Sequence, residues 1–193
     1  MEFDARSQTI QENYLRMVQL ITPRPIAWVS TRSNDGTSNL APFSFFTGVG
    51  ANPPTICFAP ANRPDGTPKD TLENIQRTGE FVVNLVTDEV GLAMHRSAED
   101  VEPEINEFRL VGVNEAASKT VQPPRVLEAS AAMECTLHSV VTLGTGPGGA
   151  NLVIGSVQYF HVKDALVDER SVKTIARAGR REYLRVNDTF RYE

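Results

Sequence analysis

The segment Lys69-Asp70-Thr71 has the residue types of an anion-binding site. A helical pattern starts there and ends at Gly79. Because the first N–H groups of a helix lack intrahelical partners and lie at the positive end of its dipole, an anion is favoured at that end. Lys69 would add a charge and Thr71 a hydroxyl. A helix start capped by Asp70 explains the same residues, and the residues alone favour this simpler interpretation.

A second polar group lies where two predicted strands meet in a hairpin. Ser30 and Thr31 end an apolar strand, and Asn39 follows early on the next strand, after the turn Ser33-Asn34-Asp35-Gly36. Short hydroxyls and an amide that converge from a hairpin suit the polar rim of a heterocycle. They also suit ordinary turn hydrogen bonds, which the residues alone make the better explanation.

An aromatic run with an internal proline occupies Ala41-Pro42-Phe43-Ser44-Phe45-Phe46. Proline inside β-like sequence indicates an edge, a bulge or a break in strand pairing, which leaves neighbouring N–H and C=O groups free for a ligand. The three phenylalanines could form a wall for a planar ring. Core packing explains them equally well, so both interpretations stand.

Other polar residues predict structure more than reaction. Asn84 lies in the apolar run 81–86 and needs hydrogen-bond partners if it is buried, so we expect it to brace a neighbouring loop rather than contact a ligand. Arg177, Arg180 and Arg181 are predicted to form a solvated helix end. In an acidic protein, the alternative is that they line the path of an anionic nicotinamide or flavin phosphate.

No metal site is predicted, because no cysteine or histidine has a second one at metal-ligand spacing. Both cysteines lie in apolar runs and are expected to be buried free thiols. The histidines are expected to be structural or exposed. The residues concerned are Cys57, Cys135, His95, His138 and His161.

The elements that must position these residues are mostly strands. Alternating apolar residues over 132–143 and 152–162, joined by a glycine-rich segment, predict a long hairpin. That segment leads into a strand, whereas a dinucleotide-binding fingerprint opens a helix. The fold class is therefore mainly β with short helices, an antiparallel barrel rather than a doubly wound sheet. Further strands are predicted at 26–32, 38–50, 55–59 and 81–86, and helices at 8–20, 69–78, 88–98 with Asp88 as N-cap, and 171–179.

The length of 193 residues suits one domain over 1–193, with an N-terminal helix and a helical C-terminal segment 171–193. The net charge of −5, without a run of Lys or Arg, argues against a nucleic-acid partner. No apolar stretch approaches the roughly 20 residues that cross a bilayer, and the N-terminus lacks a signal-peptide pattern. We therefore expect no membrane partner and a cytoplasmic protein.

Taken in order along the chain, these segments resemble the flavin reductase-like family of FMN-binding split β-barrels. The resemblance covers about residues 20–165, and the order and spacing of the segments carry it. The matching segments are Pro23-Arg24-Pro25-Ile26-Ala27-Trp28-Val29-Ser30-Thr31, Asn39-Leu40-Ala41-Pro42-Phe43-Ser44-Phe45-Phe46, Asn52-Pro53-Pro54, Lys69-Asp70-Thr71-Leu72-Glu73-Asn74-Ile75, Gly79-Glu80-Phe81-Val82-Val83-Asn84-Leu85 and Gly155-Ser156-Val157.

The resemblance implies a Greek-key antiparallel split barrel that binds FMN at the interface of a homodimer. The hairpin over 132–163 would supply barrel wall and part of the dimer surface. The residues implied to contact the flavin or its ribityl chain are Ser30, Thr31, Asn39, Ala41 and Ser44. Phe45 and Phe46 would shape the pocket. Lys69 and Thr71 would hold the phosphate.

The implied function is that of an FMN-dependent oxidoreductase. Hydride would come from NADH or NADPH, and electrons would leave to flavin, another small acceptor or a partner oxidoreductase. The flavin carries this chemistry, so no catalytic side chain is expected.

The sequence departs from the family pattern at two places. Family reductases that serve oxygenases resemble one another in a Gly-Asp-His segment, where the histidine serves the nicotinamide, but this chain reads Gly149-Ala150-Asn151. Near the C-terminus, Gly179-Arg180-Arg181-Glu182-Tyr183 replaces a Gly-Gly pair before a tyrosine. The first departure favours an alternative function, a flavin-binding electron-transfer module without its own nicotinamide site. A non-redox ligand-binding barrel is the third hypothesis.

Overall fold

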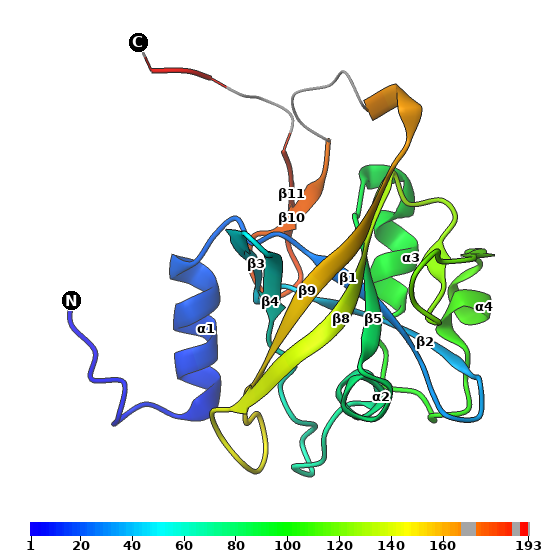
Figure 1. Ribbon diagram of the computed structural model, residues 1–193. Coiled ribbons are helices and arrows are strands. Elements are labelled where there is room, and N and C mark those ends of the chain that lie inside the picture. Colours follow the sequence, from blue (N-terminus) through cyan, green and yellow to red (C-terminus); the bar gives the residue numbers. More distant parts are fainter. Residues whose placement is uncertain (167–172, 187–189, 193) are drawn as a thin grey trace.

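A computed structural model describes residues 1–166, 173–186 and 190–192. A seven-stranded antiparallel sheet, in the order β2-β1-β5-β8-β9-β4-β3, curls into an open barrel (Figure 1). Its strands are β1 (Ala27–Arg32), β2 (Ser38–Phe43), β3 (Phe46–Ala51), β4 (Pro54–Phe58), β5 (Glu80–Asn84), β8 (Ala131–Thr142) and β9 (Asn151–Val162). This architecture confirms the mainly β antiparallel barrel that the sequence predicts.

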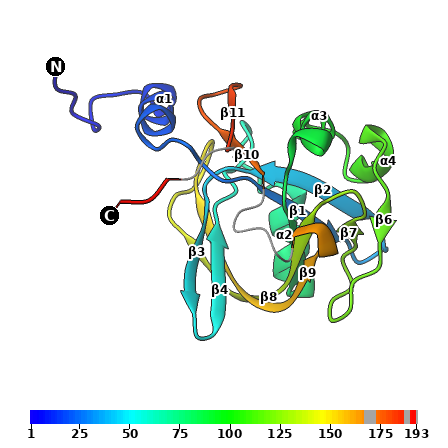
Figure 2. The same cartoon turned by 90° about the horizontal axis from the view of Figure 1, so that it is seen from above.

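Short helices and two small ribbons surround the barrel (Figures 1 and 2). The helices are α1 (Ile10–Leu20), α2 (Asp70–Thr78), α3 (Gly91–Arg96) and α4 (Glu107–Val111), with 3₁₀ turns η1 (Asp88–Val90) and η2 (Asp164–Leu166). The ribbons pair β6 (Glu115–Ala116) with β7 (Arg125–Val126), and β10 (Ile175–Arg177) with β11 (Tyr183–Arg185). None of the described helices is long and apolar enough to cross a membrane.

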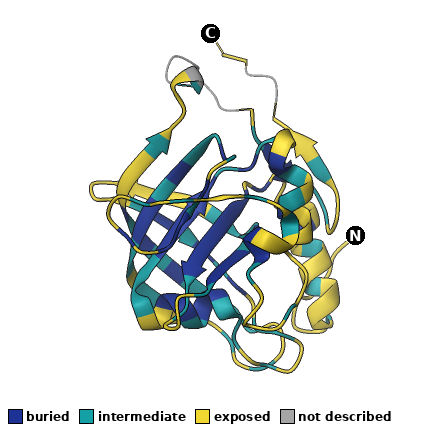
Figure 3. Cartoon of the chain, turned by 90° about the vertical axis from the view of Figure 1, so that its right-hand side faces the viewer, coloured by how far each residue is buried: buried dark blue, intermediate teal, exposed yellow. Residues whose placement is uncertain are grey.

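Strand β1 is buried on both faces, which explains its continuous apolar sequence. Val29 belongs to the cluster inside the barrel, together with Phe58 and Phe81. Trp28 belongs to a second cluster with apolar residues of α3 and α4, and its indole N–H donates to Ser97 Oγ at 2.9 Å. Figure 3 shows the buried strands surrounded by more exposed helices and loops. The sheet therefore packs against apolar side chains on both of its faces at β1.

The segment 38–50, predicted as one strand, forms two strands that lie at opposite edges of the sheet. The chain bends at Ser44 and Phe45, and β2 and β3 do not pair with each other. Pro42 lies on the edge strand β2, where a missing N–H breaks no internal ladder. The proline therefore indicates the edge correctly, whereas the prediction of a single continuous strand is wrong.

Two predictions near the helices are also wrong. The described part of the predicted helix 171–179 contains strand β10, while residues 171–172 lie outside the described residues. Backbone hydrogen bonds between Arg24 and Arg177, at 2.9 and 2.8 Å, hold this segment extended and override its helical pattern. Asp88 begins η1 instead of capping a helix, and its carboxylate accepts from Arg185 Nε at 2.8 Å.

Gly155 on β9 makes room for the Phe81 ring in the barrel interior. A Cβ at this position would overlap that ring. We expect Gly155→Ala to lower the free energy of unfolding by about 1–3 kcal/mol, because the packed core must shift to admit the methyl group. Gly48 on β3 is the matched control, because a Cβ there meets no atom within 4 Å. Urea unfolding should show a change of less than about 0.5 kcal/mol for Gly48→Ala. Equal effects in the two variants would contradict the packing argument.

Candidate functional site

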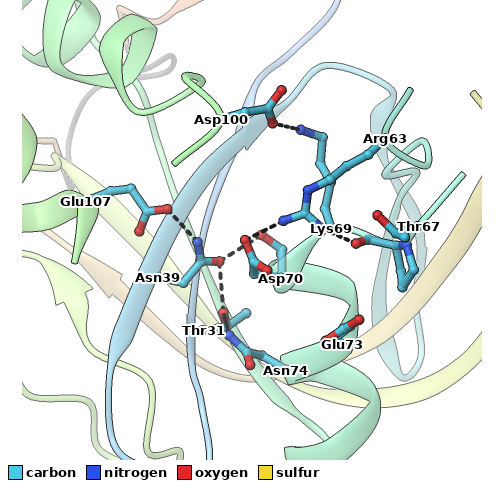
Figure 4. A network of polar contacts seen from close by, with 12 residues as sticks. Thr31, Asn39, Arg63, Thr67, Lys69, Asp70, Glu73, Asn74, Asp100 and Glu107 are labelled. Atoms are coloured by element: carbon cyan, nitrogen blue, oxygen red, sulfur yellow. Dashed lines mark hydrogen bonds and ion pairs between the residues drawn. The ribbon is translucent and has the colours of Figure 1, made fainter. Parts of the chain in front are cut away.

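The polar residues of the β1–β2 hairpin form a buried network (Figure 4). Asn39 Oδ1 accepts from the hydroxyls of Thr31 at 3.1 Å and Thr71 at 2.8 Å. Asn39 Nδ2 donates to Glu107 Oε1 at 2.8 Å, and Asn74 Nδ2 donates to Thr31 Oγ1 at 3.1 Å. The network joins β1 and β2 to α2 and α4. It therefore fixes the start of α2 relative to the sheet.

Glu107 sets the orientation of the Asn39 amide. Burial raises the pKa of this carboxyl above its ordinary value, and hydrogen bonds from the Leu40 N–H and from Asn39 oppose that effect. Because Glu107 accepts from the Asn39 NH₂ group, the Asn39 oxygen must face the two threonines. The Thr71 hydroxyl therefore donates its only proton to Asn39 within the protein.

Ser30 belongs to a separate buried group. Its hydroxyl donates to the Pro124 carbonyl at 2.5 Å and accepts from Asn84 Nδ2 at 3.3 Å. Asn84 also donates to the Trp28 carbonyl at 3.0 Å and accepts from the Val126 N–H at 2.8 Å. The prediction that Asn84 braces a neighbouring loop is confirmed.

Two ion pairs lie at the start of α2 (Figure 4). Arg63 Nη2 lies 2.6 Å from Asp70 Oδ2, and Lys69 Nζ lies 3.0 Å from Asp100 Oδ1. No side chain caps the helix, and the backbone N–H groups of Asp70 and Thr71 have no acceptor among the described residues. Interpreting Asp70 as the cap is therefore wrong, because its carboxylate contacts Arg63. A polar cavity of about 60 Å³ borders these groups.

Arg63 is not among the site residues predicted from the sequence. The available signal was its place in the loop 62–68, which leads directly into the helix start. Its contact with Asp70 puts a second cation beside Lys69.

An apolar cavity of about 250 Å³ adjoins the polar one. The end of β2 supplies Pro42 and Phe43, and the bend after it supplies Ser44 and Phe45, while α1, α3 and β10 contribute further walls. The residues that line both cavities are Pro42, Phe43, Lys69 and Ala98. The charged helix start and the aromatic bend therefore border two neighbouring cavities that share these four lining residues.

The structure brings six of the nine predicted site residues to the walls of these two cavities: Asn39, Ala41, Ser44, Phe45, Lys69 and Thr71. Ser30 and Thr31 line neither cavity, and their hydroxyls serve buried hydrogen bonds. Phe46 packs against the cluster inside the barrel. Of the cysteines, Cys135 is buried and Cys57 is partly exposed, and both are free. Contact between the nine predicted site residues and a flavin stays a prediction.

The barrel is open, because its two edge strands, β2 and β3, do not pair with each other. An open antiparallel barrel with short helices around it is a split barrel. Residues 19–177 match the family model described as "Flavin reductase like domain", so the chain belongs to the flavin reductase-like family.

Similar proteins come from several bacteria. An uncharacterised protein of Aquifex aeolicus is 37% identical over 191 residues, covering 96% of this chain and 95% of its own. Nitrilotriacetate monooxygenase component B of Bacillus cereus has a TM-score of 0.93 and 31% identity, with 100% and 98% coverage. The 2-nitrobenzoate 2-nitroreductase of Pseudomonas fluorescens has a TM-score of 0.89 and 28% identity, with 100% and 95% coverage.

Proposed function

We propose that this protein binds FMN, with the phosphate at the start of α2 and the ring system in the apolar cavity. The observation that carries the proposal is that the two cavities adjoin, with Lys69, Pro42 and Phe43 among the lining residues of both. Cations and free helix N–H groups suit a phosphate. Aromatic and aliphatic walls suit a planar ring.

The donors available to a phosphate at the start of α2 are a backbone N–H and two cations. Because the Thr71 hydroxyl already donates to Asn39, the backbone N–H of Thr71 is the group left for the ligand. Lys69 and Arg63 each contact a carboxylate of the protein, so a phosphate would compete with Asp100 and Asp70 for these cations. Binding would therefore exchange ion-pair partners.

We further propose that the protein is an oxidoreductase that takes hydride from NADH or NADPH and passes electrons to flavin or another small acceptor. The bound flavin supplies the redox chemistry, and the protein supplies binding, orientation and exclusion of water. The family, and a nitroreductase among the structural relatives, support a redox role. Such a reaction would take place in the cytoplasm, where the nicotinamide donors occur.

An absorption spectrum recorded anaerobically tests both proposals. Purified protein should be yellow or become so with added FMN, and NADH or NADPH should bleach the flavin band. Binding without bleaching by either nucleotide would overturn the reductase proposal and leave the FMN site intact. Colourless protein that takes up no FMN in a titration would favour a non-redox ligand-binding barrel.

One observation favours the alternative of an electron-transfer module without its own nicotinamide site. At the family's histidine position, Asn151 is buried and serves the fold. Its amide donates to Asn62 Oδ1 at 2.8 Å and accepts from the Thr142 hydroxyl at 3.2 Å. Reduction of the flavin only when a partner reductase is added would select this alternative.

We also propose a homodimer with the flavin at its interface. Exposed apolar side chains at the end of β9 support an interface there, namely Tyr159, Phe160 and Val162, which are 41, 57 and 48% exposed. None of the three lines either cavity, so the proposal that the flavin lies at the interface rests on the family resemblance. Sedimentation should give twice the chain mass of 21.2 kDa. A monomer at micromolar concentration would contradict the dimer.

A further inference from the structure

The wall of the apolar cavity carries positive charge from Arg177, and no described carboxylate is among its lining residues. Arg177 on β10 lines the cavity, and Arg24 lies beside it in an antiparallel bridge. Figure 2 shows the β10–β11 ribbon between α1 and α3. Within the described part of the chain neither arginine forms an ion pair, and no carboxylate lines the cavity. Lys69 lines it as well, but Lys69 pairs with Asp100.

Arg24 is 2% exposed and is surrounded by neutral acceptors. Its guanidinium donates to the carbonyls of Val18, Ile21 and Gly179 at 2.7–2.9 Å, and to Ser44 Oγ at 3.4 Å. These bonds occupy its N–H groups, and no described carboxylate lies within ion-pair distance of it. Burial lowers the pKa of Arg24; Tyr14 opposes that effect, and the charge of Arg177 adds to it. Two neighbouring cations in apolar surroundings are stabilised when an anion lies near them.

Arg177 is held in place by the ribbon that carries it. It donates to the Tyr183 hydroxyl and, at 2.6 Å, to the Arg180 carbonyl. Its guanidinium carbon lies 4.8 Å from the centre of the Tyr183 ring, and the Tyr183 hydroxyl lies 2.9 Å from His95 Nδ1. The nearby Glu182 carboxylate accepts from the Arg181 N–H at 3.0 Å, and the charge of Arg177 is one of the causes that lower its pKa, but Glu182 forms no ion pair with Arg177 and does not line the cavity. Two contacts occupy part of the five-donor guanidinium, so its other N–H groups remain for a ligand.

We propose that the Arg177 end of the cavity binds the carboxylate of a small planar organic acid, which makes such acids the substrate class of this site. A guanidinium is planar and matches the two oxygens of a carboxylate. The body of the acid would lie beside the flavin ring that the proposed function puts in the same cavity, with Phe43, Phe45 and Met94 as apolar walls shared by the two ligands. The proposal rests on the proposed FMN function, in which the phosphate lies at Lys69 and Arg177 is left for a second ligand.

Benzoate and its neutral analogue benzamide test the proposal on protein loaded with FMN. Benzoate should perturb the flavin absorption spectrum and bind at least about 10-fold more tightly than benzamide. Arg177→Gln should weaken benzoate binding by about 10-fold or more while changing the FMN dissociation constant less than about 3-fold. The matched control is Arg181→Gln, an exposed arginine of the same ribbon that does not line this cavity. It should leave benzoate binding unchanged.

Three results would overturn the proposal: equal affinity for benzoate and benzamide, no binding of either, or loss of FMN affinity in Arg177→Gln that matches its loss of benzoate affinity. The last would mean that Arg177 contacts the flavin. If Arg177→Gln does not fold, added salt should weaken benzoate but not benzamide binding to the wild-type protein, and equal weakening would count against the proposal. If the protein takes up no FMN, the proposed function fails, and calorimetric titration of the flavin-free protein with benzoate still decides the anion subsite.

Discussion

Replacing Glu134 with glutamine should lower the free energy of unfolding at pH 7 by about 3 kcal/mol. Glu134 is fully buried on β8 and accepts from four donors at 2.5–2.6 Å. The donors are the N–H groups of Lys119 and Thr120, the Thr120 hydroxyl and His161 Nε2. A glutamine offers one oxygen in place of two and turns an NH₂ group toward these donors. The segment around Thr120 would lose its attachment to the sheet.

The pH dependence of this effect has a defined sign. Burial alone would raise the pKa of Glu134, but the hydrogen bonds from Thr120, His161 and Lys119 outweigh it and lower the pKa from 4.5 to about 2. A carboxyl whose pKa is lower in the folded state stabilises the protein above its unfolded pKa. That contribution should be complete above pH 4.5 and disappear as the pH falls toward 2.

Urea unfolding of the wild type and Glu134→Gln between pH 7 and pH 2.5 measures this contribution. The difference between the two proteins should shrink as the pH falls below 4.5. Glu89→Gln removes an exposed carboxylate and serves as the control, with an expected change of less than about 0.5 kcal/mol. A difference that stays constant over this pH range would show that lost packing, not lost charge, causes the effect.

Removing either cation at the start of α2 should weaken FMN binding by about 10- to 100-fold. A hydrogen bond to a charged group contributes roughly 1.5–3 kcal/mol, and each 1.4 kcal/mol corresponds to a tenfold change in affinity. Lys69→Gln and Arg63→Gln each remove one positive charge next to the proposed phosphate position. Quenching of flavin fluorescence during titration gives the dissociation constants.

The matched control for these variants is Arg77→Gln, which removes a charge from the exposed far end of the same helix. It should change the FMN dissociation constant less than about 2-fold. Comparison of FMN with riboflavin adds a second check, because riboflavin lacks the phosphate and should bind the wild type and Lys69→Gln equally. Equal losses of affinity for both flavins would contradict phosphate binding at this helix.

Local sequence patterns predict most of the barrel because alternating apolar residues and turn residues act over short distances. The long hairpin and the helix that ends at Gly79 form as predicted, and Gly79 adopts the left-handed conformation of a helix end. The position of the break at Ser44 and Phe45 could not be predicted from local sequence, because it depends on which edges of the sheet the flanking strands occupy. Strand β10 depends likewise on pairing with Arg24, far away in the sequence.

Residue types alone indicate the parts of the site but not how those parts are used. Thr31 and Thr71 look like ligand-binding hydroxyls, yet both donate to Asn39, and that choice follows from the position of Glu107 on a distant helix. Arg63 carries no motif of its own and becomes part of the site only because the loop folds back on Asp70. Such contacts depend on tertiary structure.

The bend at Ser44 and Phe45 has a consequence for the divergence of such barrels. It joins the two edge strands and forms part of the cavity wall, yet β2 and β3 form no ladder with each other. Substitutions at the bend can therefore reshape the cavity without breaking paired strands. Selection can then act on ligand preference at this join while the rest of the barrel is inherited nearly unchanged.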